Sequence, residues 1–359
     1  MRKLPLAAFV VLLASSSLLA QQRVIFTPNG ILPVLEAYLE PLRLQAGIPG
    51  MSAALIKDGV IIWERGYGYQ DVTARIRATP DTPYMLGDAT GMLAAVLLLQ
   101  CVEQRRLELD RPLETYGINI PDRSFTLRQL LSHTSPDPEE PFTYSPGRYA
   151  QLASVMEWCA PQPYRKSVSH RILNRLAMRD SVPGTDLRNP QLLLPPGLFE
   201  PAEVQRYRDV LARMAVPYRI DSRGRPERIE LPPESMSAIG GLVTTVRDYA
   251  RLDGALDRRL LLLDETLATA WQPVPSGNQS LPQMPTGLGW FVQSYRGQRV
   301  VWHFGQITNG YSSLIVKLPD NNLTFVLLAN SDRLSSPFQL QTGEVGRSLF
   351  ASLFLKLVT

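Results

Sequence analysis

The sequence has 359 residues, of which 45% are hydrophobic and 19% are charged, so it can bury a core and wholesale disorder is excluded. Its formal net charge is only +4, with the basic residues scattered along the chain. This excludes a protein built to bind nucleic acid and gives no reason to expect an acidic membrane surface as partner. The three histidines and two cysteines lack metal-ligand spacing, so we expect no metal and no cofactor.

Residues 1–20 have the pattern of a secretory signal peptide. A basic start is followed by an apolar run from Leu4 to Leu13, and the segment ends in a small residue, Ala20. A retained membrane anchor is the alternative, although the run is short for a bilayer span. We expect an exported protein, periplasmic or secreted, with no stable membrane span after cleavage and a mature domain over residues 25–359.

Both ends of the mature chain show strand patterns. Near the N-terminus, apolar segments at 53–56 and 60–63 flank Asp58-Gly59, a strong two-residue hairpin signal. Near the C-terminus, four β-rich segments between residues 287 and 330 are separated by turn residues. A terminal helix is expected over residues 338–357.

The middle of the chain shows helical patterns instead. Residues 88–106 are apolar nearly all round, which predicts a buried helix. Other helices are expected within 126–135, after Ser145 and over 237–256. Eleven prolines between Pro161 and Pro233 predict loops and short helices, which could cover a cleft.

This order of elements predicts an α/β (α+β) fold. The antiparallel sheet would be built from both chain ends, about residues 25–87 and 285–359, and flanked by helices, with a mainly helical insert over about residues 88–284. Cys101 and Cys159 both lie in apolar helical patterns of this insert. They could form a disulfide in an exported protein or remain buried free thiols.

Several separated phrases, in order along the chain, carry a resemblance. They are "YMLGDATG", "LLSHTS", "FTYSPGRY", "GGLVTTVRDYARL", "GLGWFV" and "VVWHFGQITNGYSS". Together they resemble the serine β-lactamase and penicillin-binding protein family, most closely its class C-like branch with esterases and D-amino-acid peptidases. The resemblance covers about residues 30–357. It implies the β-lactamase/transpeptidase-like fold and a covalent mechanism in which a Ser-x-x-Lys supplies the nucleophile and the base.

The resemblance assigns part of that machinery to residues of this sequence. His303 and Gly305 match the His-x-Gly of an edge strand, and Tyr144 matches the family's tyrosine. The backbone N–H groups of Asp88 and Gln306 would form the oxyanion hole.

Three other positions of the machinery are changed. Asp88 stands at the nucleophile position, Gly91 at the lysine position, and Pro146 at the position of an asparagine that holds the substrate amide. A misplaced motif is excluded, because no serine stands three positions before any of the five lysines. The residues found there are Ala54, Pro163, Leu314 and Leu353, and Lys3 is too near the start to have one.

Asp88 is open to three interpretations. It could cap the helix, where the macrodipole favours its charge, grip a cationic ligand, or act as a carboxylate nucleophile. Its charge disfavours the carboxylate-bearing substrates of the family, because two like charges about 4 Å apart cost about 4 kcal/mol at an effective dielectric near 20. Pro146 also fits a first helical position that follows Ser145 as N-cap.

The aromatic candidates have structural interpretations as well. Tyr144 is either a packed aromatic residue or a retained functional group. His303 is either a strand residue that faces solvent or a surviving ligand contact. His133 is expected to bond buried backbone at a helix end.

The sequence therefore predicts a pseudoenzyme of this family that binds a small-molecule or peptide ligand, or an envelope protein, in the remnant cleft. The ligand-binding candidates are Asp88, Tyr144, His303 and Gln306, and no residue is assigned a catalytic role. The alternative is an active non-standard hydrolase of an ester, a β-lactam or a D-amino-acid amide.

Overall fold

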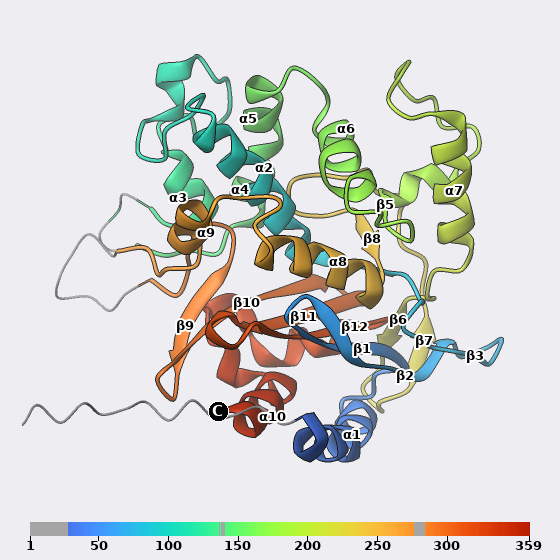
Figure 1. Cartoon of the computed structure of the whole chain (residues 1–359). Helices are drawn as coiled ribbons and strands as arrows, with labels where there is room; N and C mark the ends of the chain where they lie inside the picture. The colour runs from blue at the N-terminus through green and yellow to red at the C-terminus, as the bar shows by residue number, and fades with distance from the viewer. Residues whose placement is uncertain (1–27, 136, 138–140, 276–283) are drawn as a thin grey trace, which may run out of the picture.

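A computed structural model describes residues 28–135, 137, 141–275 and 284–359 of the chain. The predicted signal peptide lies outside these residues. Within them the chain forms a mixed α/β structure around a seven-stranded antiparallel sheet, in the order β3-β2-β1-β12-β11-β10-β9 (Figure 1). The predicted fold class is confirmed.

Both chain ends contribute strands to this sheet. Asp58 and Gly59 form the β1–β2 turn with positive φ angles of 52° and 73°, which confirms the predicted hairpin. β1 pairs with β12, so the two ends meet in the middle of the sheet. The strands are β1 (Gly50–Lys57), β2 (Val60–Asp71), β3 (Ile76–Arg77), β9 (Phe291–Tyr295), β10 (Gln298–Ile307), β11 (Tyr311–Leu318) and β12 (Leu323–Ala329).

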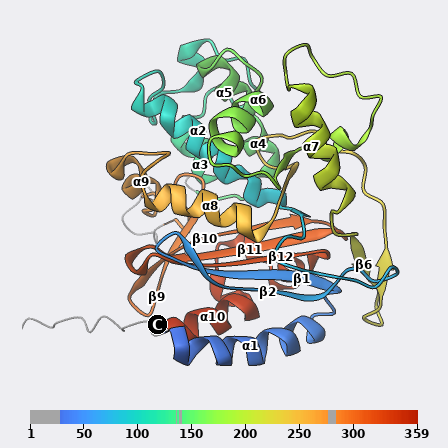
Figure 2. The ribbon, with the colours of Figure 1, turned by 45° about the vertical axis from the view of Figure 1, so that its right-hand side comes forward.

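Two terminal helices, α1 (Pro28–Gln45) and α10 (Leu349–Val358), lie side by side against one face of the sheet (Figures 1 and 2). Their apolar side chains share a core with strand residues such as Phe325. The terminal helix is shorter than the predicted 338–357. Positive φ angles at Gln339 and Gly343 keep the preceding segment in short turns, and α10 begins only after Ser348.

The opposite face of the sheet is covered by α8 (Val246–Asp257), with α2 (Gly91–Glu103) beyond it (Figure 2). The residues of α2 from Gly91 to Cys101 are all buried, as predicted from the apolar pattern. The other helices of this part are α3 (Leu127–Ser132), α4 (Pro146–Ala150), α5 (Leu152–Cys159), α6 (Tyr164–Val168), α7 (Pro201–Ala212) and α9 (Asp264–Ala270).

The prediction of one helix over residues 237–256 is wrong in its first half. Leu242–Thr244 forms β8, because this segment pairs with β4 (Tyr84–Met85) and β5 (Val182–Pro183) in a three-stranded sheet. Backbone pairing with distant segments overrides the local helical pattern here. β4 of this small sheet is followed, after Leu86, by the turn that contains Asp88.

Cys101 of α2 and Cys159 of α5 form a disulfide, which decides between the two alternatives left open by the sequence. The proline-rich segment 161–233 contains α6, α7 and a small hairpin of β6 (Tyr218–Ile220) and β7 (Pro226–Arg228). In the described part of the chain, no helix combines the length and apolar character that a membrane crossing needs.

Candidate functional site

The loop before α2 lies directly against β10. Ser313 donates a hydrogen bond to the Leu86 carbonyl at 2.8 Å, and a Cβ added to Gly305 would lie 1.8 Å from the same oxygen. Only glycine permits this approach of two backbones. Gly87 has a φ of 62°, and a Cβ there would lie 2.7 Å from the Gln306 nitrogen. The packing therefore brings Asp88 and Gln306 to one place.

The carboxyl of Asp88 contacts Tyr144. The Tyr144 hydroxyl donates a hydrogen bond to Asp88 Oδ2 at 3.0 Å. Asp88 is not a helix cap: it lies inside the 3₁₀ turn Gly87–Thr90, which begins after Leu86, and neither this turn nor α2 has a side-chain cap. The capping interpretation is wrong because the carboxyl accepts a hydrogen bond from Tyr144 and, in the described chain, makes none to the backbone N–H groups of the helix start.

Burial raises the pKa of Asp88 from its ordinary value of 3.8 to about 7. The hydrogen bond from Tyr144 acts in the opposite direction, and the nearby carboxylate of Glu234 raises the pKa further. Among the described residues, no lysine, arginine or histidine forms an ion pair with Asp88. The carboxyl is therefore a partly buried acid with one side-chain hydrogen-bond donor and, within the described chain, no counter-ion.

The lysine position is closed by an aromatic ring. Tyr149 donates a hydrogen bond to the Gly91 carbonyl at 3.0 Å. A Cβ added to Gly91 would lie 3.0 Å from Cε1 of Tyr149 and 3.3 Å from Cδ1 of Ile239. The space in which a lysine side chain would begin is thus occupied by packed side chains.

Pro146 takes the structural role predicted for it. It is the first residue of α4, and the Ser145 hydroxyl caps this helix by accepting a hydrogen bond from the Arg148 N–H at 3.3 Å. His133 Nδ1 accepts a hydrogen bond from the Ser145 N–H at 3.2 Å, which confirms that His133 bonds buried backbone at a helix end.

His303 does not face solvent, so that interpretation is wrong. Its side chain is buried on β10, and its Nδ1 donates to the Phe304 carbonyl at 2.7 Å. Burial lowers the pKa of His303 to about 4, and burial likewise lowers the pKa of His133 to about 3, so both rings are neutral at pH 7. The side of β10 that carries His303 is covered because the helical part of the fold packs over it.

A cavity of about 290 Å³ lies beside Asp88, and no residue of the proline-rich segment 161–233 lines it. Asp88 is its one charged lining residue in the described chain, and His303 does not reach it. Sequence reasoning missed three of the polar residues on its walls, which lie in turns and loops without a recognisable motif. The lining residues are Asp88, Tyr144, Phe304, Gln306, Thr308, Ser336 and Gln341.

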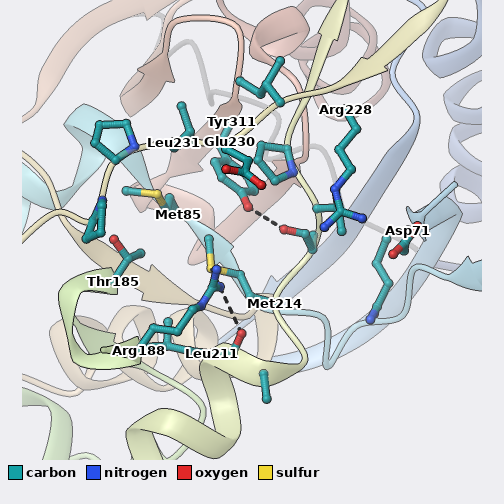
Figure 3. A pocket seen from close by; sticks show the side chains of 18 of the residues that line it. Asp71, Met85, Thr185, Arg188, Leu211, Met214, Arg228, Glu230, Leu231 and Tyr311 are labelled. Atoms are coloured by element: carbon teal, nitrogen blue, oxygen red, sulfur yellow. Dashed lines mark hydrogen bonds between the residues drawn. The ribbon is translucent and has the colours of Figure 1, made fainter. Parts of the chain in front are cut away.

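The proline-rich segment builds the walls of a different and larger cavity of about 700 Å³ (Figure 3). Thr185 and Arg188, the end of α7 and residues 228–233 line it, together with Met85 and Tyr311 from the sheet side. The sequence suggested that this segment could cover a cleft. None of its residues lines the cleft beside Asp88, and several of them line this second cavity instead. Nowhere in the described residues do three potential metal ligands gather.

A family model described as Beta-lactamase matches residues 35–345 of the sequence. The chain belongs to the beta-lactamase family. Curated relatives match over a short stretch only. Protein flp of Staphylococcus aureus is 32% identical over 104 residues, which are 27% of this chain and 21% of that protein. The mouse protein "Serine beta-lactamase-like protein LACTB, mitochondrial" is 30% identical over 104 residues, 27% and 19% of the two chains. The match thus spans about a fifth of each relative.

Solved structures match over most of this beta-lactamase-family chain. An octameric penicillin-binding protein homologue from Pyrococcus abyssi has a TM-score of 0.70 and 22% identity, and the match covers 90% of this chain and 77% of that one. A D-amino acid amidase from Ochrobactrum anthropi has a TM-score of 0.66 and 18% identity, with 90% and 98% covered. At these identities the likeness establishes the fold alone.

Proposed function

We propose that this beta-lactamase-family protein is a pseudoenzyme that binds a ligand with an ammonium group beside Asp88, without covalent turnover. One observation carries the proposal: a partly buried carboxyl, with no counter-ion among the described residues, stands where the family's reaction needs a hydroxyl. A carboxylate that accepts a hydrogen bond from Tyr144 is a weak nucleophile, and position 91 holds a glycine and offers no lysine as a base.

The electrostatics of the cavity favour a cation. An ammonium group within about 4 Å of Asp88 would be attracted by about 4 kcal/mol at an effective dielectric near 20, before the cost of its desolvation. A ligand carboxylate at the same place would be repelled by a similar amount. The backbone N–H groups of Asp88 and Gln306 remain candidates to hold a carbonyl oxygen of the same ligand.

The compartment and the natural partner belong to the proposal as well. A disulfide between Cys101 and Cys159 supports an oxidising compartment, as expected for an exported protein, periplasmic or secreted. A small molecule or a peptide with a free amine fits a cavity of about 290 Å³. An envelope protein could present the same group through an exposed lysine side chain or N-terminus.

Calorimetry with a matched set of ligands tests this function. An amine such as D-alanine amide should bind at pH 8, whereas its N-acetylated form should bind at least about tenfold more weakly. Asp88→Asn, which keeps the shape and removes the charge, should abolish the difference. Binding of the two ligands with equal affinity would refute the ammonium site.

A second candidate function rests on the pKa of Asp88, which lies near neutrality and suits a general base. Asp88 would take a proton from water, the hydroxide would add to an ester or amide carbonyl, and the proton would return to the leaving group. Turnover of an ester or D-amino-acid amide panel would support this candidate if Asp88→Asn abolished it. Turnover unchanged in that variant would indicate a contaminant.

A further inference from the structure

The larger cavity is separate from the cleft that carries Asp88. Its volume is about 700 Å³, and it shares no lining residue with the smaller cavity. Volumes of this size are typical of small-molecule sites. The cavity lies between the end of α7, residues 228–233 and the edge of the main sheet (Figure 3).

One wall of this cavity presents the guanidinium of Arg188, an exposed residue that is oriented by contacts with the end of α7 and the residues after it. Arg188 Nη2 donates a hydrogen bond to the Leu211 carbonyl at 3.1 Å and lies 3.8 Å from the Met214 sulfur. No carboxylate pairs with Arg188 in the described parts of the chain. In Figure 3 its guanidinium lies beside Met214, among the side chains that line the cavity. The remaining N–H groups are therefore available to a ligand.

The turn that carries Arg188 is held in place by its neighbours. Arg165 forms an ion pair with Asp186 at 2.6 Å. The Thr185 hydroxyl accepts a hydrogen bond from the Glu234 N–H at 2.9 Å. These contacts fix the backbone that precedes Arg188, so the position from which its side chain enters the cavity wall is defined.

Apolar side chains form part of the cavity lining. Met85 and Tyr311 approach from strands, and Leu211 and Met214 approach from the end of α7 and the residues after it (Figure 3). Leu231 approaches from residues 228–233, which we call the strap. The Tyr311 hydroxyl donates a hydrogen bond to the Ala215 carbonyl, so its proton is not available to a ligand. Its ring is almost fully buried, so the small part that reaches the cavity can offer a ligand only an apolar contact.

The charge pattern selects among anions. A guanidinium fork matches a carboxylate in a bidentate geometry. Asp71 and Glu230 also line the cavity, and they would repel a doubly charged phosphate more than a carboxylate. Arg228 lies on the same strap as Glu230 and partly offsets these acids.

We propose that this cavity is a second ligand site, which binds a monocarboxylate with an apolar body through Arg188. The carboxylate pairs with the guanidinium, and the body packs on Met85, Met214 and the Tyr311 ring. Two sources share this chemistry: a peptide C-terminus with an apolar side chain, and a fatty acid. The site acts independently of the proposed chemistry at Asp88.

Calorimetry on the full mature chain tests the proposal with four probes. N-acetyl-L-leucine should bind at least about tenfold more tightly than N-acetyl-L-leucinamide, which lacks the charge, and than N-acetylglycine, which lacks the apolar body. Octanoate separates the sources: tighter binding of octanoate assigns the site to fatty acids, and weaker binding assigns it to peptides.

Two arginine-to-glutamine variants test whether the carboxylate binds at Arg188. Arg188→Gln should remove the preference for the carboxylate, whereas Arg223→Gln, at an exposed loop position, should leave it unchanged. Arg188→Glu should reverse the preference and favour L-leucinamide, whose amine is charged. The proposal is overturned if Arg188→Gln binds N-acetyl-L-leucine as the parent does, if inorganic phosphate binds more tightly, or if no probe binds up to about 10 mM.

Discussion

The ring of Tyr149 occupies the space that a side chain at position 91 would need, with Cε1 of the ring 3.0 Å from the point where a Cβ on Gly91 would stand. The ring is fixed there by its own hydrogen bond to the Gly91 carbonyl. A side chain at position 91 would therefore require Tyr149 and Ile239 to shift.

Restoring the motif alone should therefore not restore the chemistry. In the double variant Asp88→Ser/Gly91→Lys, the new lysine meets Tyr149 and Ile239, and such overpacking costs about 1–3 kcal/mol. We expect a lower free energy of unfolding in urea and no labelling by fluorescent penicillin. Gly147→Ala is the control, since a Cβ there meets nothing within 4 Å. Efficient labelling of the double variant would show that the ring moves aside.

Stability should depend on pH through Asp88. Its pKa is higher in the folded protein, about 7, than its ordinary value of 3.8, so the folded state binds more protons between these values. The stabilising contribution is present below about pH 4 and is lost as the pH rises to 7. Asp88→Asn should consequently be more stable than the parent at pH 8, by about 1–3 kcal/mol. Urea unfolding at pH 5 and pH 8 measures the difference, and equal effects at both values would contradict it.

The hydroxyl of Tyr144 should control the ionisation of Asp88. Tyr144→Phe keeps the ring contact with Phe304, whose centroid is 5.3 Å away, and removes the hydrogen bond to the carboxyl. Because that bond stabilises the ionised form, the pKa of Asp88 should rise above 7. Carboxyl ¹³C NMR measures the titration directly. An unchanged pKa in this variant, with Tyr38→Phe as an exposed control, would show that the bond is absent in solution.

A buried ion-pair cluster should be needed for the fold. Lys317 of β11 lies 3.0 Å from Asp253 and 2.8 Å from Asp257 of α8. Lys317→Ala leaves two buried carboxyls without their partner and should cost about 3–5 kcal/mol in unfolding free energy. Lys356→Ala on the exposed side of α10 should change it by less than about 0.5 kcal/mol. Similar losses in both variants would contradict this assignment.

The sequence predicts the elements of this fold well where local signals are strong. The Asp58-Gly59 turn and the apolar stretch of α2 need no distant partner to be recognised. The segment that forms β8 could not be predicted in this way, because its strand character comes from pairing with Tyr84–Met85 and Val182–Pro183.

For the site, the sequence shows which groups are missing but not what replaces them. It places Asp88, Tyr144 and Gln306 in one cleft, and the structure brings them together. The burial of His303 and the filling of the lysine space by Tyr149 depend on packing between distant segments. The same holds for the cavity around Arg188, which no motif marks.

Covalent labelling tests most directly whether the cleft beside Asp88 forms an acyl intermediate. The purified protein would be incubated with fluorescent penicillin or a fluorophosphonate, and its intact mass would be measured beside that of an active family member. We predict an unmodified mass under conditions that label the active enzyme completely. A stoichiometric adduct on a residue that lines this cleft would contradict the account.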